Sequence, residues 1–324
     1  MAGGPTTIAL VEAVGNAGGF PFLAAGYKTA EAVADDIRAV QDIGRPFGVN
    51  VFVPSGIRID PDVFRAYADE LRGEADEYGL ALDAVPRTDD DGWDAKIALL
   101  LEHPVPVVSF TFGLPSAAEV SALRKAGSVV LGSVTTADEA RQGAEVGVDG
   151  LVVQGSDGGG HSAAFDPARA ITSIATDDLI RQVRSVVDVP LIAAGGVDGP
   201  GAVRTLLSAG ASAVAVGTML LRTDEAGTSP THRSALTDPR FDHTVITHAF
   251  TGRPARGLAN GFIGRHEPTA PLGYPEIHHL TRPLRQAAAR AGDAERLHLW
   301  AGTGFRNAPA GPAAAVVGSL AALI

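Results

Sequence analysis

A glycine-rich segment that ends in a histidine is the part of the sequence best suited to chemistry. Residues 154–161 read QGSDGGGH and directly follow an apolar run. Glycines allow the backbone to lie close to a flat ligand. The imidazole of His161 suits proton transfer, because its ordinary pKa is about 6.5. We take His161 as a candidate base, the alternative being a solvated or structural histidine. Gln154 could hydrogen-bond a heterocycle edge or the backbone.

Two glycine corners follow later apolar runs. Gly195 and Gly196 follow residues 190–194, and Gly217 with Thr218 follows residues 213–216. We expect a helix soon after each corner, and bare amide groups at a helix N-terminus favour an anion. Two such corners after the last strands of a (β/α)8 barrel form its usual phosphate site. The pair therefore predicts phosphate binding, the alternative being glycines that only turn tight corners.

Three other polar features need an interpretation. Asn50 interrupts an apolar run, so its amide must find a partner in the backbone or in a ligand. The pair His278-His279 has only Glu276 nearby at a helpful spacing, so we expect packing rather than a metal site. Asp89-Asp90-Asp91 reads as a solvated loop. We predict no metal.

The elements that must position these residues alternate between strands and helices. Short apolar runs separated by helical stretches predict an α/β fold with a parallel sheet, as in a (β/α)8 TIM barrel, and a doubly wound sheet would fit almost as well. Helices are expected over residues 7–17 and 30–43 and from Pro61 to about Tyr78. The predicted strands are residues 20–24, 47–52, 105–110, 129–132, 150–154, 190–194 and 213–216.

Seven strands are one fewer than an eight-stranded barrel needs. Residues 1–4 read like the exit loop of a strand, so we expect the true start to lie upstream of Met1, the alternative being a barrel with an open seam. Beyond Arg222 the alternation stops. Residues 223–265 look polar and helical in patches, residues 268–279 irregular, and helices are expected near 282–291 and 308–323. We predict a barrel over 1–222 and a C-terminal extension, 223–324, packed on it as a single structural unit.

Composition narrows the function classes. The 324 residues are 45% hydrophobic and carry a net charge of −11, which argues against nucleic acid as a partner. The chain has no cysteine and hence no disulfide, thiolate ligand or cysteine nucleophile. No apolar stretch approaches the ~20 residues that span a bilayer, and the start does not read as a signal peptide. We expect a cytoplasmic enzyme and leave a homo-oligomer open.

Taken together, these motifs resemble the nitronate monooxygenase family, formerly called 2-nitropropane dioxygenases, and its class I branch in particular. The resemblance covers nearly the whole chain, and its C-terminal segments are the more specific part. The matching segments are residues 17–20, 23–27, 48–50, 154–161, 190–199, 216–220, 249–257, 274–279 and 299–304.

The resemblance implies a barrel that binds FMN non-covalently and oxidises alkyl nitronates or nitroalkanes with O2, with His161 as the catalytic base. Two alternatives stay open: an NAD(P)H-dependent flavin reductase with a quinone or enoyl-thioester acceptor, and a flavin-binding barrel without turnover. The FMN contacts that the resemblance implies are Met1, Ala2, Gly3, Asn50, Gln154, Gly159, Gly195, Gly196, Val216, Gly217, Thr218 and Met219.

Overall fold

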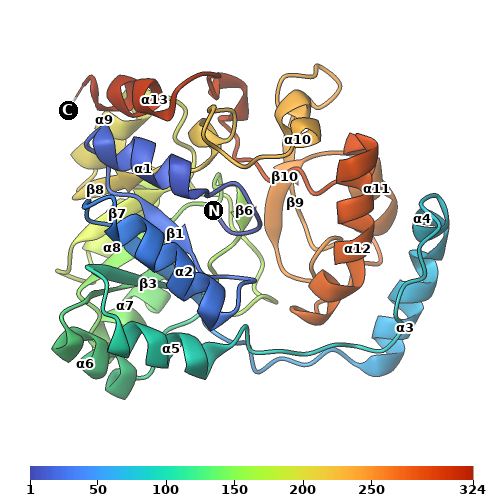
Figure 1. Cartoon of the computed structure of the whole chain (residues 1–324), viewed down its shortest axis with the longest axis horizontal. Coiled ribbons are helices and arrows are strands. Elements are labelled where there is room, and N and C mark those ends of the chain that lie inside the picture. Colours follow the sequence, from blue (N-terminus) through green and yellow to red (C-terminus); the bar gives the residue numbers. More distant parts are fainter. Residues whose placement is uncertain (324) are drawn as a thin grey trace.

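A curled parallel sheet forms one half of the molecule (Figure 1). The computed structural model describes residues 1–323. The strands run in the order β1-β2-β3-β4-β5-β7-β8, and within the described residues β8 is not hydrogen-bonded to β1, so the sheet is an open, barrel-like half. Each of the seven predicted runs overlaps one strand, and β3 and β4 extend one and two residues beyond their predicted ends. The strands are β1 Phe22–Ala24, β2 Gly48–Phe52, β3 Val107–Thr111, β4 Val129–Val134, β5 Gly150–Gln154, β7 Leu191–Ala194 and β8 Ala213–Ala215.

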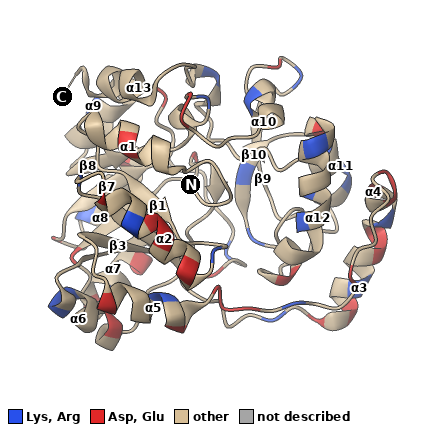
Figure 2. Ribbon diagram, viewed as in Figure 1, with Lys and Arg blue, Asp and Glu red and all other residues tan. Residues whose placement is uncertain are grey.

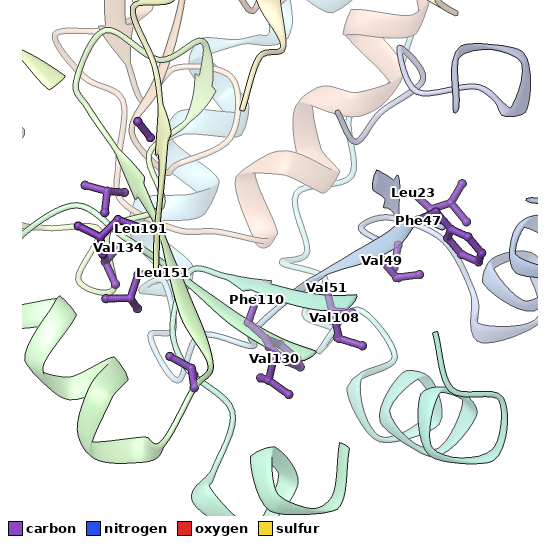
Figure 3. Close-up of a cluster of buried hydrophobic side chains, with 14 of the residues drawn as sticks. Leu23, Phe47, Val49, Val51, Val108, Phe110, Val130, Val134, Leu151 and Leu191 are labelled. Atoms are coloured by element: carbon purple, nitrogen blue, oxygen red, sulfur yellow. The ribbon is translucent and has the colours of Figure 1, made fainter. Parts of the chain in front are cut away.

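Helices cover the outer face of this sheet, and an apolar core fills the space between them. Side chains such as Val49, Val108 and Phe110 from neighbouring strands are fully buried there (Figure 3). Caps fix where the helices start: Thr29 accepts a hydrogen bond at the start of α2, and Ser116 forms a capping box at the start of α6. The helices are α1 Ile8–Asn16, α2 Ala30–Gln41, α5 Trp93–Glu102, α6 Ala117–Ala126, α7 Ala137–Val146, α8 Thr176–Arg184, α9 Pro200–Ser208 and α13 Ala313–Ala321.

A second, antiparallel sheet corrects the expectation for residues 223–265. Beyond the short helix α10 (Pro230–Ala235), this segment forms β9 (Thr244–Thr247) and β10 (Ala255–Leu258) rather than only helical patches. The third strand is β6 (Gly160–His161), which pairs with β10. Four-residue strands have little periodicity of their own, and the distant partner β6 is not visible locally. This pairing ties the histidine loop to the C-terminal half.

A second apolar core joins two segments that are far apart in sequence. The helix expected to reach Tyr78 is split at Leu71 into α3 (Pro61–Glu70) and α4 (Arg72–Asp76). Both pack against α11 (Gly261–His266) and α12 (Glu276–Ala291), at the end of the molecule away from the curled sheet (Figure 1). Residues 59–75 thus share a core with residues 249–284. The division at residue 222 stays a prediction.

Two further helix bounds differ from the expectation. The helix near 282–291 is the end of α12, which begins at Glu276, and the helix expected over 308–323 is shorter, α13, preceded by the 3-10 turn η3 (Phe305–Asn307). Proline accounts for the second difference, because Pro312 precedes the first helical residue of α13. Within residues 1–323, no helix combines the length and apolar character that crossing a membrane requires.

Candidate active site

A cavity of about 740 Å³ lies where the carboxyl ends of the strands meet α12 and the second sheet. Every residue that the sequence singled out for catalysis or cofactor binding lines it, with the exception of Met219. Met219 lies in the 3-10 turn η1 (Thr218–Leu220) and is buried in the barrel core instead. The strand exits therefore bring together residues that are up to about two hundred positions apart in the chain.

The glycine corners form a cradle of exposed backbone at one end of the cavity. Gly195 and Gly196 have φ of +96° and +74°, and a Cβ on Gly195 would lie 2.9 Å from the carbonyl oxygen of Gly155. Among the described residues, the N–H groups of Gly196 and Gly217 donate to no protein acceptor. Because both glycines line the cavity, these free donors suit an anionic oxygen from a ligand.

A third glycine segment, which sequence reasoning did not place in the site, closes the cradle. A Cβ on Gly159 would lie 2.5 Å from the backbone nitrogen of Gly302, so the two backbones can approach only as glycines. Gly302 N donates to Thr218 Oγ1 at 2.9 Å, and Thr303 N donates to the carbonyl of Asp157 at 3.1 Å. The C-terminal segment thereby fixes the histidine loop against the corner at Thr218.

Two predicted amides find their partners within the protein. The Gln154 side chain donates from Nε2 to the His161 carbonyl (3.0 Å) and accepts at Oε1 from the N–H of Ala163 (2.7 Å). Of the two roles considered for Gln154, the structure shows hydrogen bonds to the backbone, and these hold the histidine loop in place. Asn50 Nδ2 donates to the hydroxyls of Ser109 (2.9 Å) and Thr111 (3.0 Å), which keeps Asn50 at the cavity wall.

The imidazole of His161 lies in an aromatic enclosure. Ring centroids of Phe112, Tyr274 and Trp300 are 5.7, 5.8 and 5.6 Å away, and His161 Nε2 lies 2.9 Å from Oγ1 of Thr251. Burial, reinforced by the nearby positive charges of Arg253 and Arg285, lowers the pKa of His161 to about 3. The ring is therefore neutral at physiological pH and available to accept a proton.

Two buried guanidinium groups make the neighbourhood of His161 electropositive. Arg253 is 1% exposed, stacks over the Phe112 ring at 4.0 Å and leaves Nε and Nη1 without a partner. Arg285 is 6% exposed, lines the cavity, and donates to the hydroxyl of Thr281 and the carbonyl of His278. No carboxylate in the described residues forms an ion pair with either arginine. Figure 2 shows further basic residues along α12. This side of the cavity suits an anion.

The wall next to Arg285 corrects two sequence interpretations. His278 stacks on Tyr27 (centroids 4.2 Å apart, 2° between planes) and lines the cavity, rather than only packing in the extension. The acidic loop is not simply solvated: Asp91 accepts from the N–H of Tyr27 (2.8 Å) and pairs with buried Lys96, while His279 Nε2 lies 2.8 Å from Asp89. This loop therefore positions one side of the site.

The sequence and the fold are similar to those of known proteins. The sequence model of a family described as nitronate monooxygenase matches residues 1–322. The chain belongs to the nitronate monooxygenase family. It is therefore a flavin-dependent oxidoreductase. A Staphylococcus aureus (strain Newman) protein named "Probable nitronate monooxygenase" is 35% identical over 323 residues, which cover 98% of this chain and 90% of that protein.

Solved structures extend the comparison to the fold. The crystal structure of a nitroalkane oxidase from Streptomyces ansochromogenes has a TM-score of 0.94 and 46% identity, covering 99% of this chain and 93% of that one. FabK from Thermotoga maritima has a TM-score of 0.75 at 23% identity, covering 99% and 89%. At that identity the likeness shows a shared fold alone.

Proposed function

We propose that this nitronate monooxygenase family member binds FMN and oxidises alkyl nitronates, and the nitroalkanes from which they form, with O2. The observation that carries the proposal is the pairing of a neutral His161 with the buried, uncompensated guanidinium of Arg285 in one cavity. The Streptomyces neighbour, a nitroalkane oxidase by name, supports the substrate class.

The cradle at Gly195, Gly196 and Gly217 fits the phosphate of a mononucleotide. Free N–H donors with no side chains in the way suit an anionic group, and a dinucleotide would need a second such cradle. These residues would hold the phosphate, and Asn50 and Gly159 would lie along the body of the cofactor. When bound, the flavin would take electrons from the substrate and deliver them to O2.

His161 and Arg285 would act on different parts of the substrate, His161 on the α-proton and Arg285 on the nitro group. With a neutral nitroalkane, the α-carbon C–H bond breaks, the proton goes to the imidazole, and the electron pair moves onto the nitro group to give the nitronate. A positive guanidinium beside the nitro oxygens stabilises the negative charge that forms on them, because charge–charge attraction is strong where water is excluded. A preformed nitronate needs no proton transfer, so only Arg285 would act on it.

Anaerobic mixing tests the proposal against the reductase alternative. The FMN-loaded protein is mixed without O2 with nitroethane, with ethyl nitronate or with NADH, and flavin absorbance is followed. We expect bleaching by the two nitro substrates and slow or no bleaching by NADH. Rapid bleaching by NADH alone would refute the proposal in favour of a reductase, and no bleaching by any of them would favour a flavin-binding barrel without turnover.

A further inference from the structure

We propose that Thr251 is a positioning residue that fixes His161 in the tautomer with the proton on Nε2, so that Nδ1 is the basic nitrogen. This inference rests on the proposed role of His161 as the base and specifies the atom that performs it. The two side chains lie 90 positions apart in sequence and meet through Oγ1 of Thr251 and Nε2 of His161 at 2.9 Å.

The direction of this hydrogen bond follows from the second partner of Thr251. Its hydroxyl has one proton, and Oγ1 also lies 3.2 Å from the backbone carbonyl of Arg253. A carbonyl cannot donate, so that bond takes the hydroxyl proton. No other donor among the described residues reaches the Arg253 carbonyl, and Arg253 is 1% exposed, so giving the proton to His161 would leave a buried acceptor unpaired. The imidazole must therefore donate from Nε2.

The other ring nitrogen is free for substrate. His161 lines the cavity, and no hydrogen bond within the described residues involves Nδ1. A neutral imidazole with a proton on Nε2 carries its lone pair on Nδ1. In the opposite tautomer Nδ1 would be protonated and unable to take the α-proton. The proton on Nε2 is thus a condition for proton transfer at the cavity side.

The turn that carries Thr251 is held firmly in place. The N–H groups of Thr251 and Gly252 both donate to the carbonyl of His248, at 3.1 and 2.7 Å. Gly252 has φ +70°, and a Cβ there would lie 2.8 Å from the backbone of Gly273, whose N–H donates to the Gly252 carbonyl at 3.0 Å. Because this contact fixes the turn, the threonine hydroxyl is fixed relative to the ring before substrate arrives.

Nitrogen-15 NMR of histidine-labelled, FMN-loaded protein tests the assignment directly. The two ring nitrogens of a neutral imidazole give separate resonances according to which one is protonated. We expect the wild-type His161 signals at pH 7.5 to show the proton on Nε2. Thr251→Ser keeps the hydroxyl and is expected to give the same pattern, while Thr251→Val removes the acceptor and is expected to shift the population toward the other tautomer.

Turnover gives the second measurement. Loss of one hydrogen bond to a neutral group shifts a population by up to about tenfold. We therefore expect Thr251→Val to lower kcat/KM for nitroethane about tenfold, to change it little for ethyl nitronate, and Thr251→Ser to restore it. A wild-type spectrum with the proton on Nδ1 would overturn the assignment, even if Thr251→Val fails to fold. So would a Thr251→Val protein with an unchanged tautomer and unchanged nitroethane activity. The spectrum does not depend on turnover, so failure of the proposed function would be seen separately.

Discussion

Replacement of His161 by glutamine separates proton transfer from the rest of the reaction. Glutamine keeps a polar group beside Thr251 but has no basic nitrogen. Because general base catalysis contributes roughly 10²- to 10⁴-fold, we expect kcat/KM for nitroethane to fall by at least about 100-fold. For preformed ethyl nitronate, which needs no base, we expect less than about a tenfold loss.

The structure also sets the pH dependence of the wild-type protein. Burial and the two arginines bring the pKa of His161 to about 3, and the difference from its ordinary 6.5 corresponds to about 5 kcal/mol against the imidazolium. Proton transfer from a nitroalkane creates a nitronate beside that imidazolium, and two opposite charges about 4 Å apart attract by roughly 4 kcal/mol at an effective dielectric constant near 20. The two effects nearly cancel. The lowered pKa means that His161 accepts a bulk proton only in strong acid, so the base stays available well below pH 6.5.

Oxygen consumption measured from pH 5 to 9 with both substrates checks these expectations. The control is His298→Gln, since His298 lines the same cavity and burial also lowers its pKa, and it should leave the ratio of nitroethane to nitronate rates unchanged. Equal losses on both substrates in His161→Gln would refute the base role. A wild-type loss of nitroethane activity centred near pH 6.5 and absent from His161→Gln would refute the argument from burial.

Three further changes test other parts of the structure. Gly217→Val adds a side chain at the phosphate corner, where φ is not positive, so the variant should lose its flavin on gel filtration. The control Gly201→Ala, whose added Cβ would lie in open space, should retain it. Retention by both variants would exclude this corner as the phosphate site. Arg285→Gln removes a charged hydrogen bond worth about 1.5–3 kcal/mol, so KM for ethyl nitronate should rise tenfold or more, and an unchanged KM would place the anion elsewhere. Burial alone would raise the pKa of Glu74, but hydrogen bonds from Arg265, His266 and Arg296 lower it to about 2. Glu74→Gln should therefore lower the free energy of unfolding, measured in urea at pH 7, by about 3 kcal/mol. The loss should shrink as the pH falls from about 4.5 toward 2, because wild type loses that contribution there, and a constant difference would contradict the assignment.

The sequence predicted the parts of the molecule whose signals are local. Strands of the curled sheet are continuous apolar runs because helices cover one face and the core the other. Glycine corners such as Gly195-Gly196 were visible because only glycine tolerates their positive φ beside another backbone. His161 stood out as the one histidine that follows a glycine-rich strand exit.

Residues contributed by distant segments could not be predicted in the same way. Thr251 and Arg253 belong to the site only because β10 pairs with β6, and nothing near them in sequence indicates that pairing. Arg285 had a weak signal. It lies four residues after Thr281 on the buried face of α12, and a charged side chain is rarely buried unless it is paired.

The shared core of residues 59–75 and 249–284 has a consequence for how the protein is made. On a ribosome, helices α3 and α4 emerge long before the segment that covers them, so Phe64 and Tyr67 stay open to water while nearly two hundred more residues are added. Contacts of such long sequence separation slow folding. Nascent chains of this protein are therefore expected to depend on chaperones until the second half has left the exit tunnel.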